Sequence, residues 1–356
     1  MKICFLIDDY SATGGIQRVV PLVCNALTDA HEIHVVSMYN EHGQNNRDSY
    51  TASIRHSVLI SGKKEYIKQA FRVVGLLRKY LRDNQIDVLV ETSEMLSPYS
   101  FLATLGLKVP YILWTHSTAF RYNEALTQRP FKRLGISTSA YTVALTGKIR
   151  DELIGKYKVS NIVSIPNPID SELMRSVSYN GAEKKIISVG RICYEKYYEK
   201  LIEVAEIVLK NNPEWTWDVY GDGEDRLKYE KMASDKGITR LTFKGNANNL
   251  YELYREYAFL VMTSRSEAFP MAILEGTASG LPLVAFAIDG VNEMIKGNGY
   301  LVTPFDQNEM ADCIQKLIDS ETLRREFSEK SIQLRNEYDI LKIAEKWNAL
   351  FDRIKR

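Results

Sequence analysis

The regular alternation of short apolar runs with longer amphipathic segments limits this chain to an α/β fold. Residues 3–7 form an unbroken apolar run, as expected of a strand covered on both faces. A helical pattern follows over residues 16–27, and the same order recurs along the chain. Alternating strands and helices build parallel sheets with helices on both faces. The pattern therefore predicts doubly wound, Rossmann-like domains.

The segment Pro166-Asn-Pro168-Ile-Asp170 predicts a boundary between two such domains. Each proline fixes its own φ and restricts the residue before it, which favours a stiff, extended connector. The 356 residues are enough for two hydrophobic cores. We predict an N-terminal domain over residues 1–170, joined by C-terminal helices at about 336–356, and a second domain over 171–335. Two facing domains of this kind would bind a ligand in the cleft between them.

Two carboxylates, Glu267 and Glu275, stand eight positions apart in the stretch from residue 264 to 282. Pro270 occupies the expected first position of a helix that follows an apolar run, and a glycine and a proline close that helix. A helix N-terminus at the carboxyl end of a strand attracts phosphate. Glu275 lies far enough along to accept hydrogen bonds from hydroxyl groups. A nucleotide sugar, with phosphate at one end and a polyol at the other, would suit this stretch.

A second set of polar residues follows the first strand of the second half. Gly190 and Arg191 come directly after that strand, and Lys196 follows five residues later. Arginine binds phosphate oxygens in a bidentate manner, and lysine adds a point charge. Alone, this pair is more typical of a solvated loop. Together with the helix N-terminus after Pro270, it predicts a diphosphate site.

The first half offers a glycine pair and one histidine as candidate ligands. Gly14 and Gly15 open a helix after the first strand, where glycine lets backbone approach a ligand closely, although most such pairs are only turns. His116 follows the apolar run 111–114. A single histidine is more often a structural hydrogen-bonding group, but the carboxyl end of a strand is where ligands bind in open α/β sheets.

Charge composition argues against a nucleic-acid partner, because 46 Lys and Arg residues are balanced by 45 Asp and Glu residues. Basic residues do gather between Lys63 and Arg82, within a predicted helix over residues 63–84. One interpretation is a solvated basic face, and the alternative is contact with an anionic membrane surface. The predicted buried stripe of this helix consists of Ile67, Phe71, Val74, Leu77 and Leu81.

Several other classes of site lack their usual sequence signals. The four cysteines are scattered without a Cys-x-x-Cys pair, so neither zinc nor a disulfide framework is indicated. The N-terminal apolar run is too short for a signal peptide, and no run reaches the ~20 residues of a membrane span. No acidic cluster forms a magnesium set. We therefore expect a soluble, cytoplasmic protein whose site needs no metal or other cofactor.

These motifs resemble the retaining glycosyltransferases of family 4, which have the two-domain GT-B architecture. The resemblance covers nearly the whole chain, and its most specific part is the Glu-x7-Glu element with an upstream Gly-Arg and Lys. The other matching segments are Gly14-Gly15, the strand end at His116, Pro166–Asp170, Gly221-Asp-Gly223, Phe243-Lys-Gly245 and Gly280-Leu-Pro282.

The resemblance implies a role for each site residue. Arg191 and Lys196 would bind the donor diphosphate, Glu275 the ribose hydroxyls, and Glu267 the transferred hexose. His116 would contact the sugar near the reacting carbon, so that the implied catalytic residues are His116, Arg191, Lys196 and Glu267. The implied donor-binding residues are Gly14, Gly15, Gly190, Arg191, Lys196, Glu267, Ala268, Phe269, Pro270, Met271 and Glu275.

The resemblance further implies transfer of a hexose from a nucleotide diphosphate, UDP above all, with retention of configuration by front-side attack. The acceptor would be a hydroxyl of a glycan or a lipid-linked intermediate of a surface polysaccharide. Tyr197, Ala268 and Gln17 depart from the family pattern, and Tyr197 stands where the family usually has glycine. Two alternatives stay open: a nucleotide-sugar epimerase of the same architecture, and a non-catalytic module that binds nucleotide sugars.

Overall fold

The computed structural model describes residues 1–10, 14–41, 46–118, 128–169, 173–174, 179–247 and 250–355. Its contacts divide the chain into two units, Met1–Pro168 with Ile340–Arg356, and Ile169–Asp339. The sequence-based limits were residues 170/171 and 335/336, so the second unit begins and ends slightly differently. Ile169 and Asp339 form a parallel bridge, which ties the two ends of the second unit together. Asp170 of the predicted connector lies outside the described residues.

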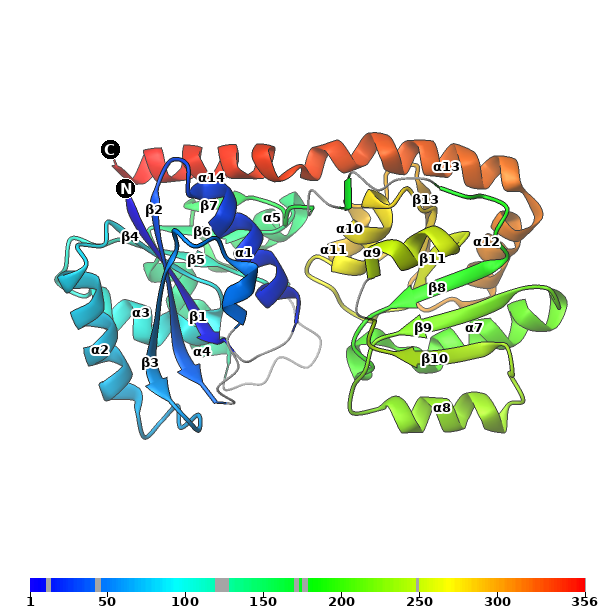
Figure 1. Ribbon diagram of the computed structural model, residues 1–356, viewed down its shortest axis with the longest axis horizontal. Coiled ribbons are helices and arrows are strands. Elements are labelled where there is room, and N and C mark those ends of the chain that lie inside the picture. The colour runs from blue at the N-terminus through cyan, green and yellow to red at the C-terminus, as the bar shows by residue number, and fades with distance from the viewer. Residues whose placement is uncertain are drawn as a thin grey trace. The chain divides into compact units, whose positions relative to one another are not determined.

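The first unit is a parallel sheet of seven strands in the order β3-β2-β1-β4-β5-β6-β7 (Figure 1). Its strands are β1 (Lys2–Asp9), β2 (Glu32–Asn40), β3 (Arg55–Ser61), β4 (Val88–Glu91), β5 (Tyr111–Trp114), β6 (Tyr141–Ala144) and β7 (Ile162–Ser164). Its helices are α1 (Gly15–Leu27), α2 (Ala70–Asp83), α3 (Ser97–Thr104), α4 (Arg129–Thr138), α5 (Gly147–Tyr157) and α14 (Ile340–Lys355), with short 3-10 turns η1 (Asn46–Ser49) and η2 (Glu94–Leu96).

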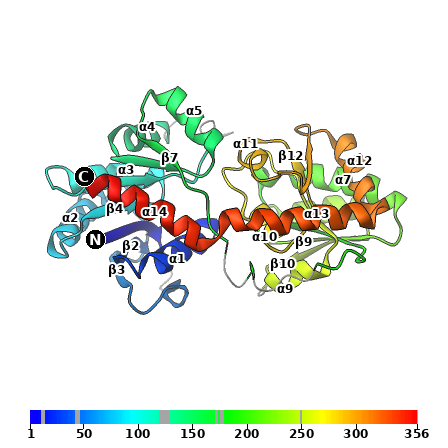
Figure 2. The same ribbon diagram turned by 90° about the horizontal axis from the view of Figure 1, so that it is seen from above.

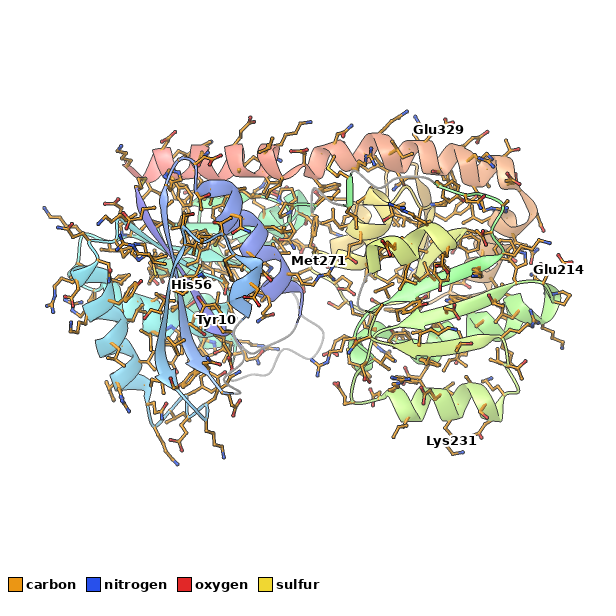
Figure 3. The ribbon with its side chains drawn as sticks, in the orientation of Figure 1. Tyr10, His56, Glu214, Lys231, Met271 and Glu329 are labelled. Atoms are coloured by element: carbon orange, nitrogen blue, oxygen red, sulfur yellow. The ribbon has the colours of Figure 1, made fainter. Side chains whose placement is uncertain are left out.

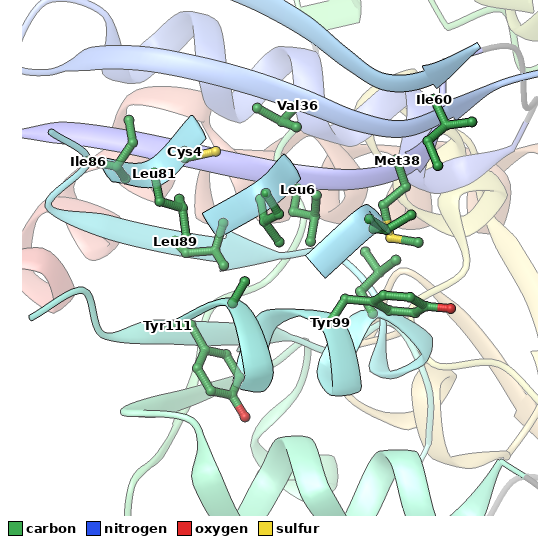
Figure 4. Close-up of a cluster of buried hydrophobic side chains, with 14 of the residues drawn as sticks. Cys4, Leu6, Val36, Met38, Ile60, Leu81, Ile86, Leu89, Tyr99 and Tyr111 are labelled. Carbon is green, nitrogen blue, oxygen red and sulfur yellow. The ribbon is translucent and has the colours of Figure 1, made fainter. Parts of the chain in front are cut away.

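The two faces of this sheet are covered by different helices. On one face, Cys4 and Leu6 of β1 pack with Leu77 of α2 and Ala103 of α3 in a buried cluster (Figure 4). The opposite face is covered by α1 and α14, which lie side by side (Figure 2). There Trp347 of α14 packs its ring edge-on against Phe5 and Trp114. The C-terminal helix is thus part of the core of the first unit.

The second unit is a parallel sheet of six strands in the order β10-β9-β8-β11-β12-β13. Its strands are β8 (Lys185–Val189), β9 (Thr216–Tyr220), β10 (Leu241–Gly245), β11 (Phe259–Met262), β12 (Leu283–Phe286) and β13 (Gly299–Val302). Its helices are α7 (Tyr198–Asn211), α8 (Arg226–Asp235), α9 (Leu250–Leu253), α10 (Met271–Ala278), α11 (Asp289–Asn292), α12 (Gln307–Asp319) and α13 (Glu321–Leu334), with 3-10 turns η3 (Tyr194–Lys196), η4 (Tyr254–Glu256) and η5 (Arg335–Tyr338).

Helices again cover both faces of this second sheet. α7 packs against α8 and α12, whereas α10 packs against α13. In Figure 1, α8 lies next to β10, and α10 lies next to α13. Counted within the unit, the strand order is 3-2-1-4-5-6, the order of the dinucleotide-binding fold. The predicted class, two Rossmann-like α/β domains, is therefore confirmed.

Strand β3 and the start of α2 differ from the sequence-based expectation. β3 was not predicted, because most of its residues are only partly buried and it lies at the edge of the sheet. α2 begins at Ala70 instead of Lys63, and it buries Val73, Leu77 and Leu81.

The predicted burial of Ile67 and Phe71 is wrong, since both side chains are exposed. An ideal helix turns about 100° per residue, which places Phe71 about 120° around the axis from Leu77. Apolar spacing alone therefore did not show which residues of the stripe face the sheet.

Candidate active site

The predicted donor residues of the second unit follow the two strands at which its strand order reverses. β8 lies at the centre of the order, with β9 on one side and β11 on the other. The loop after β8 contains Gly190, Arg191 and Lys196, and the loop after β11 contains Glu267. In open α/β sheets this switch point is where ligands bind. Topology alone therefore brings together residues that are far apart in sequence.

Lys196 and Glu267 form an ion pair across these two loops. Both side chains are largely buried, and Ser264 donates a second hydrogen bond to the same oxygen of Glu267, at 2.7 Å. Thr263 joins the two loops further, because its hydroxyl lies 3.2 Å from the carbonyl oxygen of Lys196. The result is a fixed cation and a fixed carboxylate at the carboxyl edge of the sheet. The sequence predicted both residues, but not Ser264 or Thr263.

Arg265 holds the Lys196 loop in place from the other side. Its backbone N–H donates to the carbonyl oxygen of Glu195 at 2.8 Å, and its Nε donates to that of Tyr194 at 3.2 Å. The guanidinium also lies over the rings of Tyr194 and Tyr197, 4.4 Å and 3.2 Å from their centroids. Tyr197 has a left-handed backbone, with φ 55° and ψ 48°. Glycine adopts that conformation at least cost, which explains the family preference at this position.

The N-terminus of α10 adjoins the loop that carries Glu267. Pro270 is the N-cap in extended conformation, and Met271 is the first helical residue (Figure 3). Pro270 has no polar side chain and so gives no side-chain cap, and the N-terminus of α10 carries the positive end of the helix dipole. Gly290 of α11 supports the loop, because a Cβ at this position would lie 2.2 Å from the carbonyl oxygen of Glu267. Only glycine permits this approach. The role of Gly290 was not predicted, and the sequence feature that could have indicated it is its position shortly after β12.

Glu275 is buried on α10, with only 4% of its surface exposed. Tyr254 of η4 donates a hydrogen bond to its Oε2 at 2.8 Å. Burying a carboxylate is costly unless hydrogen bonds compensate it, so this contact stabilises Glu275 within α10. Tyr254 was not predicted as a site residue, because nothing in its local sequence points toward Glu275.

Arg191 has a different partner from Lys196. Its guanidinium pairs with Glu224 at 2.9 Å, and 71% of the Arg191 side chain is exposed. The turn that carries Glu224 packs on the same loop, since a Cβ on Gly221 would lie 2.0 Å from the carbonyl oxygen of Gly190. Gly221 therefore has a structural role, because a larger residue could not pack against Gly190 in this way. The exposed Arg191–Glu224 ion pair contributes little to stability. Arg191 therefore remains accessible to a phosphate.

In the first unit, the candidate residues follow the carboxyl ends of β1 and β5. Gly15 begins α1 after β1, and Gly14 is its N-cap without a side-chain hydrogen bond. His116 follows β5, two residues after Trp114, and its ring lies 4.8 Å from the indole ring. Gly14, Gly15 and His116 thus belong to the first unit, and the other candidates belong to the second.

The His116 imidazole is held as a neutral ring. Burial lowers the pKa of His116 to about 4, although the charge of Glu94 opposes part of this change. Its Nε2 is buried, and none of the described residues forms a hydrogen bond with it. A neutral imidazole with one nitrogen not engaged by those residues can exchange a hydrogen bond with a sugar hydroxyl.

A charged network holds the two residues that flank His116. Thr115 and Ser117 both donate hydrogen bonds to the Glu94 carboxylate, the latter at 2.6 Å. Lys132 of α4 donates to the Ser117 hydroxyl at 2.9 Å and is itself only 2% exposed. Burial opposes ionisation of Glu94, but Lys132 and the two hydroxyls lower its pKa overall. Neither Glu94 nor Lys132 was predicted, since Lys132 lies in a helix that the sequence pattern did not reveal.

Two expected absences concern only the part of the chain that is described. Across those residues, no three His, Cys, Asp or Glu side chains gather closely enough for a metal ion, and metal independence stays a prediction. No helix built from them combines the length and apolarity needed to cross a bilayer. All four cysteines are buried and free.

Comparison with known proteins follows the same division into halves. The sequence model of "Glycosyl transferases group 1" matches residues 170–334, and that of "Glycosyltransferase Family 4" matches residues 13–173. The chain belongs to glycosyltransferase family 4. Each of the two sequence models thus matches one half of the chain. The strand order shows that each half contains one Rossmann-like domain.

Three bacterial relatives match this glycosyltransferase over nearly the full length of both chains. An uncharacterized glycosyltransferase of Haemophilus influenzae is 28% identical, with 98% of this chain and 99% of that protein covered. The amylovoran biosynthesis glycosyltransferase AmsD of Erwinia amylovora is 25% identical, with 99% of each chain covered. An alpha-1,4-N-acetyl-D-galactosaminyltransferase of Campylobacter jejuni, whose name includes a PP-undecaprenol-linked glycan, is 23% identical over 100% of this chain and 99% of its own length.

Solved structures of similar architecture share little sequence with this glycosyltransferase. HepE of Anabaena, crystallised with UDP, has a TM-score of 0.85 at 18% identity, with 99% of this chain and 100% of that chain covered. TarM of Staphylococcus aureus, in a complex that includes UDP, has a TM-score of 0.85 at 17% identity, covering 98% and 99%. This likeness shows the fold. The roles of individual residues in this family 4 member depend on its own geometry.

Proposed function

We propose that this glycosyltransferase moves a hexose from a UDP-sugar to a hydroxyl of a glycan or lipid-linked acceptor during surface polysaccharide synthesis, with retention of configuration. The observation that carries the proposal is the Lys196–Glu267 ion pair beside the N-terminus of α10. HepE with UDP-glucose, TarM with UDP and the polysaccharide relatives support the choice of donor and pathway.

Each donor group has a matching protein group in the second unit. Lys196 would bind the diphosphate and stabilise the charge that develops as the nucleotide leaves. The exposed Arg191 would exchange Glu224 for phosphate oxygens, and the α10 N-terminus would add its dipole. Glu267 would accept hydrogen bonds from the hexose, and Glu275 from the ribose.

The first unit would supply the acceptor side of the reaction. Neutral His116 would hydrogen-bond the sugar near the reacting carbon, and Gly14 and Gly15 would let the backbone approach the diphosphate. We assign the Glu94 carboxylate to holding Thr115 and Ser117, which already donate to it. Retention would then follow from front-side attack, in which the leaving phosphate takes the proton of the acceptor hydroxyl.

A donor panel with mass spectrometry of the products tests this function. Slow release of UDP from one UDP-hexose, and faster transfer when an acceptor is present, is the expected result. Interconversion of the free sugar nucleotide would instead establish an epimerase. Donor binding without any turnover would establish a binding module.

Two variants and a matched control test the site itself. Glu275→Ala should weaken UDP binding at least tenfold, because the ribose hydroxyls lose a charged acceptor worth about 1.5–3 kcal/mol. Lys196→Ala should lower turnover more than donor affinity, since its charge acts mainly on the departing nucleotide. Lys231→Ala is the control, because Lys231 is an exposed lysine of α8 paired with Asp235. Full activity in both site variants would overturn the assignment.

A further inference from the structure

Two apolar side chains stand out on the surface of the first unit. Ile67 is 92% exposed and Phe71 is 89% exposed, which makes them the most exposed large apolar side chains among the described residues. They are four positions apart, so they lie on the same side of the helical turn that leads into α2. The next position on that side is Gly75, which adds no side chain. Single exposed apolar residues are normal, but an exposed isoleucine and phenylalanine side by side favour a binding surface.

This exposure does not result from a loosely held segment. Tyr66, directly before Ile67, donates a hydrogen bond from its hydroxyl to Asp8 at 2.9 Å. Its carbonyl oxygen accepts a hydrogen bond from Tyr99 at 3.0 Å, and its ring packs edge-on against Tyr39. Buried Val73 follows Phe71 two residues later. The two apolar side chains are therefore presented by backbone that is fixed on both sides.

Exposed basic residues flank the two apolar side chains along the chain. Lys68 and Arg72 each follow one of them directly, and Lys63 precedes both. Lys68 also pairs with Glu65 at 2.9 Å, but both side chains are substantially exposed, so this pair is weak. Lys64 differs, because it is bound to Asp8 and Asp9 at the end of β1 and is not part of this surface. The basic face predicted from Lys63 to Arg82 thus has an apolar centre at its N-terminal end.

We propose that the surface formed by Lys63, Ile67, Lys68, Phe71 and Arg72 docks on an anionic lipid bilayer. Ile67 and Phe71 would insert among the acyl chains, and the three basic residues would lie at the headgroups. Apolar residues flanked by lysine and arginine are typical of segments that lie in the membrane interface. A second copy of the chain fits less well, since its own basic residues would meet these. Two side chains also provide far less than the ~800 Å² that each partner of a stable dimer buries.

The position of this surface suits an enzyme with a lipid-linked acceptor. Lys64 and Tyr66 attach it to Asp8 and Asp9, at the carboxyl end of β1. His116 and Gly15 lie at the carboxyl ends of β5 and β1, on the same edge of the sheet. Docking therefore places the carboxyl edge of the first sheet, where His116 and Gly15 lie, near the membrane surface. The proposal itself requires no step of the transfer reaction.

Vesicle flotation tests the docking independently of turnover. The intact protein should bind vesicles of equal parts phosphatidylglycerol and phosphatidylcholine, and bind pure phosphatidylcholine much more weakly. Ile67→Ser and Phe71→Ser should each weaken binding roughly tenfold or more, because each removes the burial of one large apolar side chain. Lys68→Gln and Arg72→Gln should each weaken it about fivefold, and added salt should have the same effect. Leu227→Ser is the control, since Leu227 of α8 is also 81% exposed.

Insertion is tested directly by the Phe71→Trp variant. The four native tryptophans are all buried, so quenching of its added fluorescence by brominated lipids reports contact of residue 71 with acyl chains. Absence of quenching, or vesicle binding that the Ile67 and Phe71 variants do not weaken, would overturn the proposal. So would a stable dimer in light scattering that Ile67→Ser dissociates, because the occupant would then be a second copy.

Discussion

The low pKa of His116 leads to a specific dependence of stability on pH. Burial lowers this pKa to about 4, whereas an unfolded histidine titrates near 6.5. Between these values the unfolded chain binds one more proton than the folded chain does at this residue. The free energy of unfolding therefore falls as the pH falls through this window. With these two pKa values, the contribution of His116 falls by about 2 kcal/mol between pH 7 and pH 5.

The assay compares urea unfolding of the wild type and His116→Gln at both pH values. Other groups titrate in the same range, but they contribute equally to both proteins, so the difference between the two pH-dependent losses isolates His116. The variant should lose about 2 kcal/mol less than the wild type. An NMR titration of the imidazole gives the pKa directly. A His116 midpoint near 6.5, together with equal acid sensitivity of the two proteins, would refute the burial argument and the neutral role of this ring.

Three further perturbations test other parts of the structure. Burial raises the pKa of Glu91 to about 8, so the folded chain keeps a proton that the unfolded chain loses above about 4.5, and stability falls as the pH rises between them. Glu91→Gln should flatten that fall, as measured by urea unfolding at pH 5.5 and pH 8. Tyr254→Phe removes a hydrogen bond to buried Glu275 and should lower the free energy of unfolding by about 1.5–3 kcal/mol and weaken UDP binding by calorimetry. Gly290→Ala should displace the Glu267 loop and weaken UDP binding at least tenfold, and unchanged affinity would contradict the close packing.

The strand pattern of both domains was predictable because most strands are buried on both faces. Continuous apolar runs such as Leu283–Phe286 then appear without interruption in the sequence. β3 lacks this signal, since it lies at the edge of its sheet and is mostly only partly buried. The orientation of the segment that leads into α2 was not predicted correctly either, for a different reason. Ile67 and Phe71 have the spacing of a core stripe, but the fixed contacts of Tyr66 leave them at the surface.

The site was predictable where residues follow a strand directly. Lys196 and Glu267 are 71 positions apart, and each could be placed at a strand end because parallel strands have their carboxyl ends at one edge. Their partners could not be predicted in this way. Glu224 pairs with Arg191 through a turn on the neighbouring strand, and Lys132 reaches Ser117 from a helix with no clear pattern. Such contacts depend on side-chain direction in the folded chain, which sequence spacing does not give.

Tyr197 shows how a departure from a family pattern is compensated by its surroundings. A non-glycine residue in the left-handed conformation costs roughly 1–2 kcal/mol. The Tyr197 ring, which glycine would lack, contacts the Arg265 guanidinium at 3.2 Å and packs edge-on against Phe305. A cation–π contact of this kind contributes about 0.5–2 kcal/mol, so the two effects are of similar size. Arg265 in turn holds the loop before Lys196 through the carbonyl oxygen of Glu195. Tyr197 is therefore one member of a cluster that keeps Lys196 facing Glu267. A comparison of position 197 with the family pattern alone does not show this role, because the role depends on Arg265.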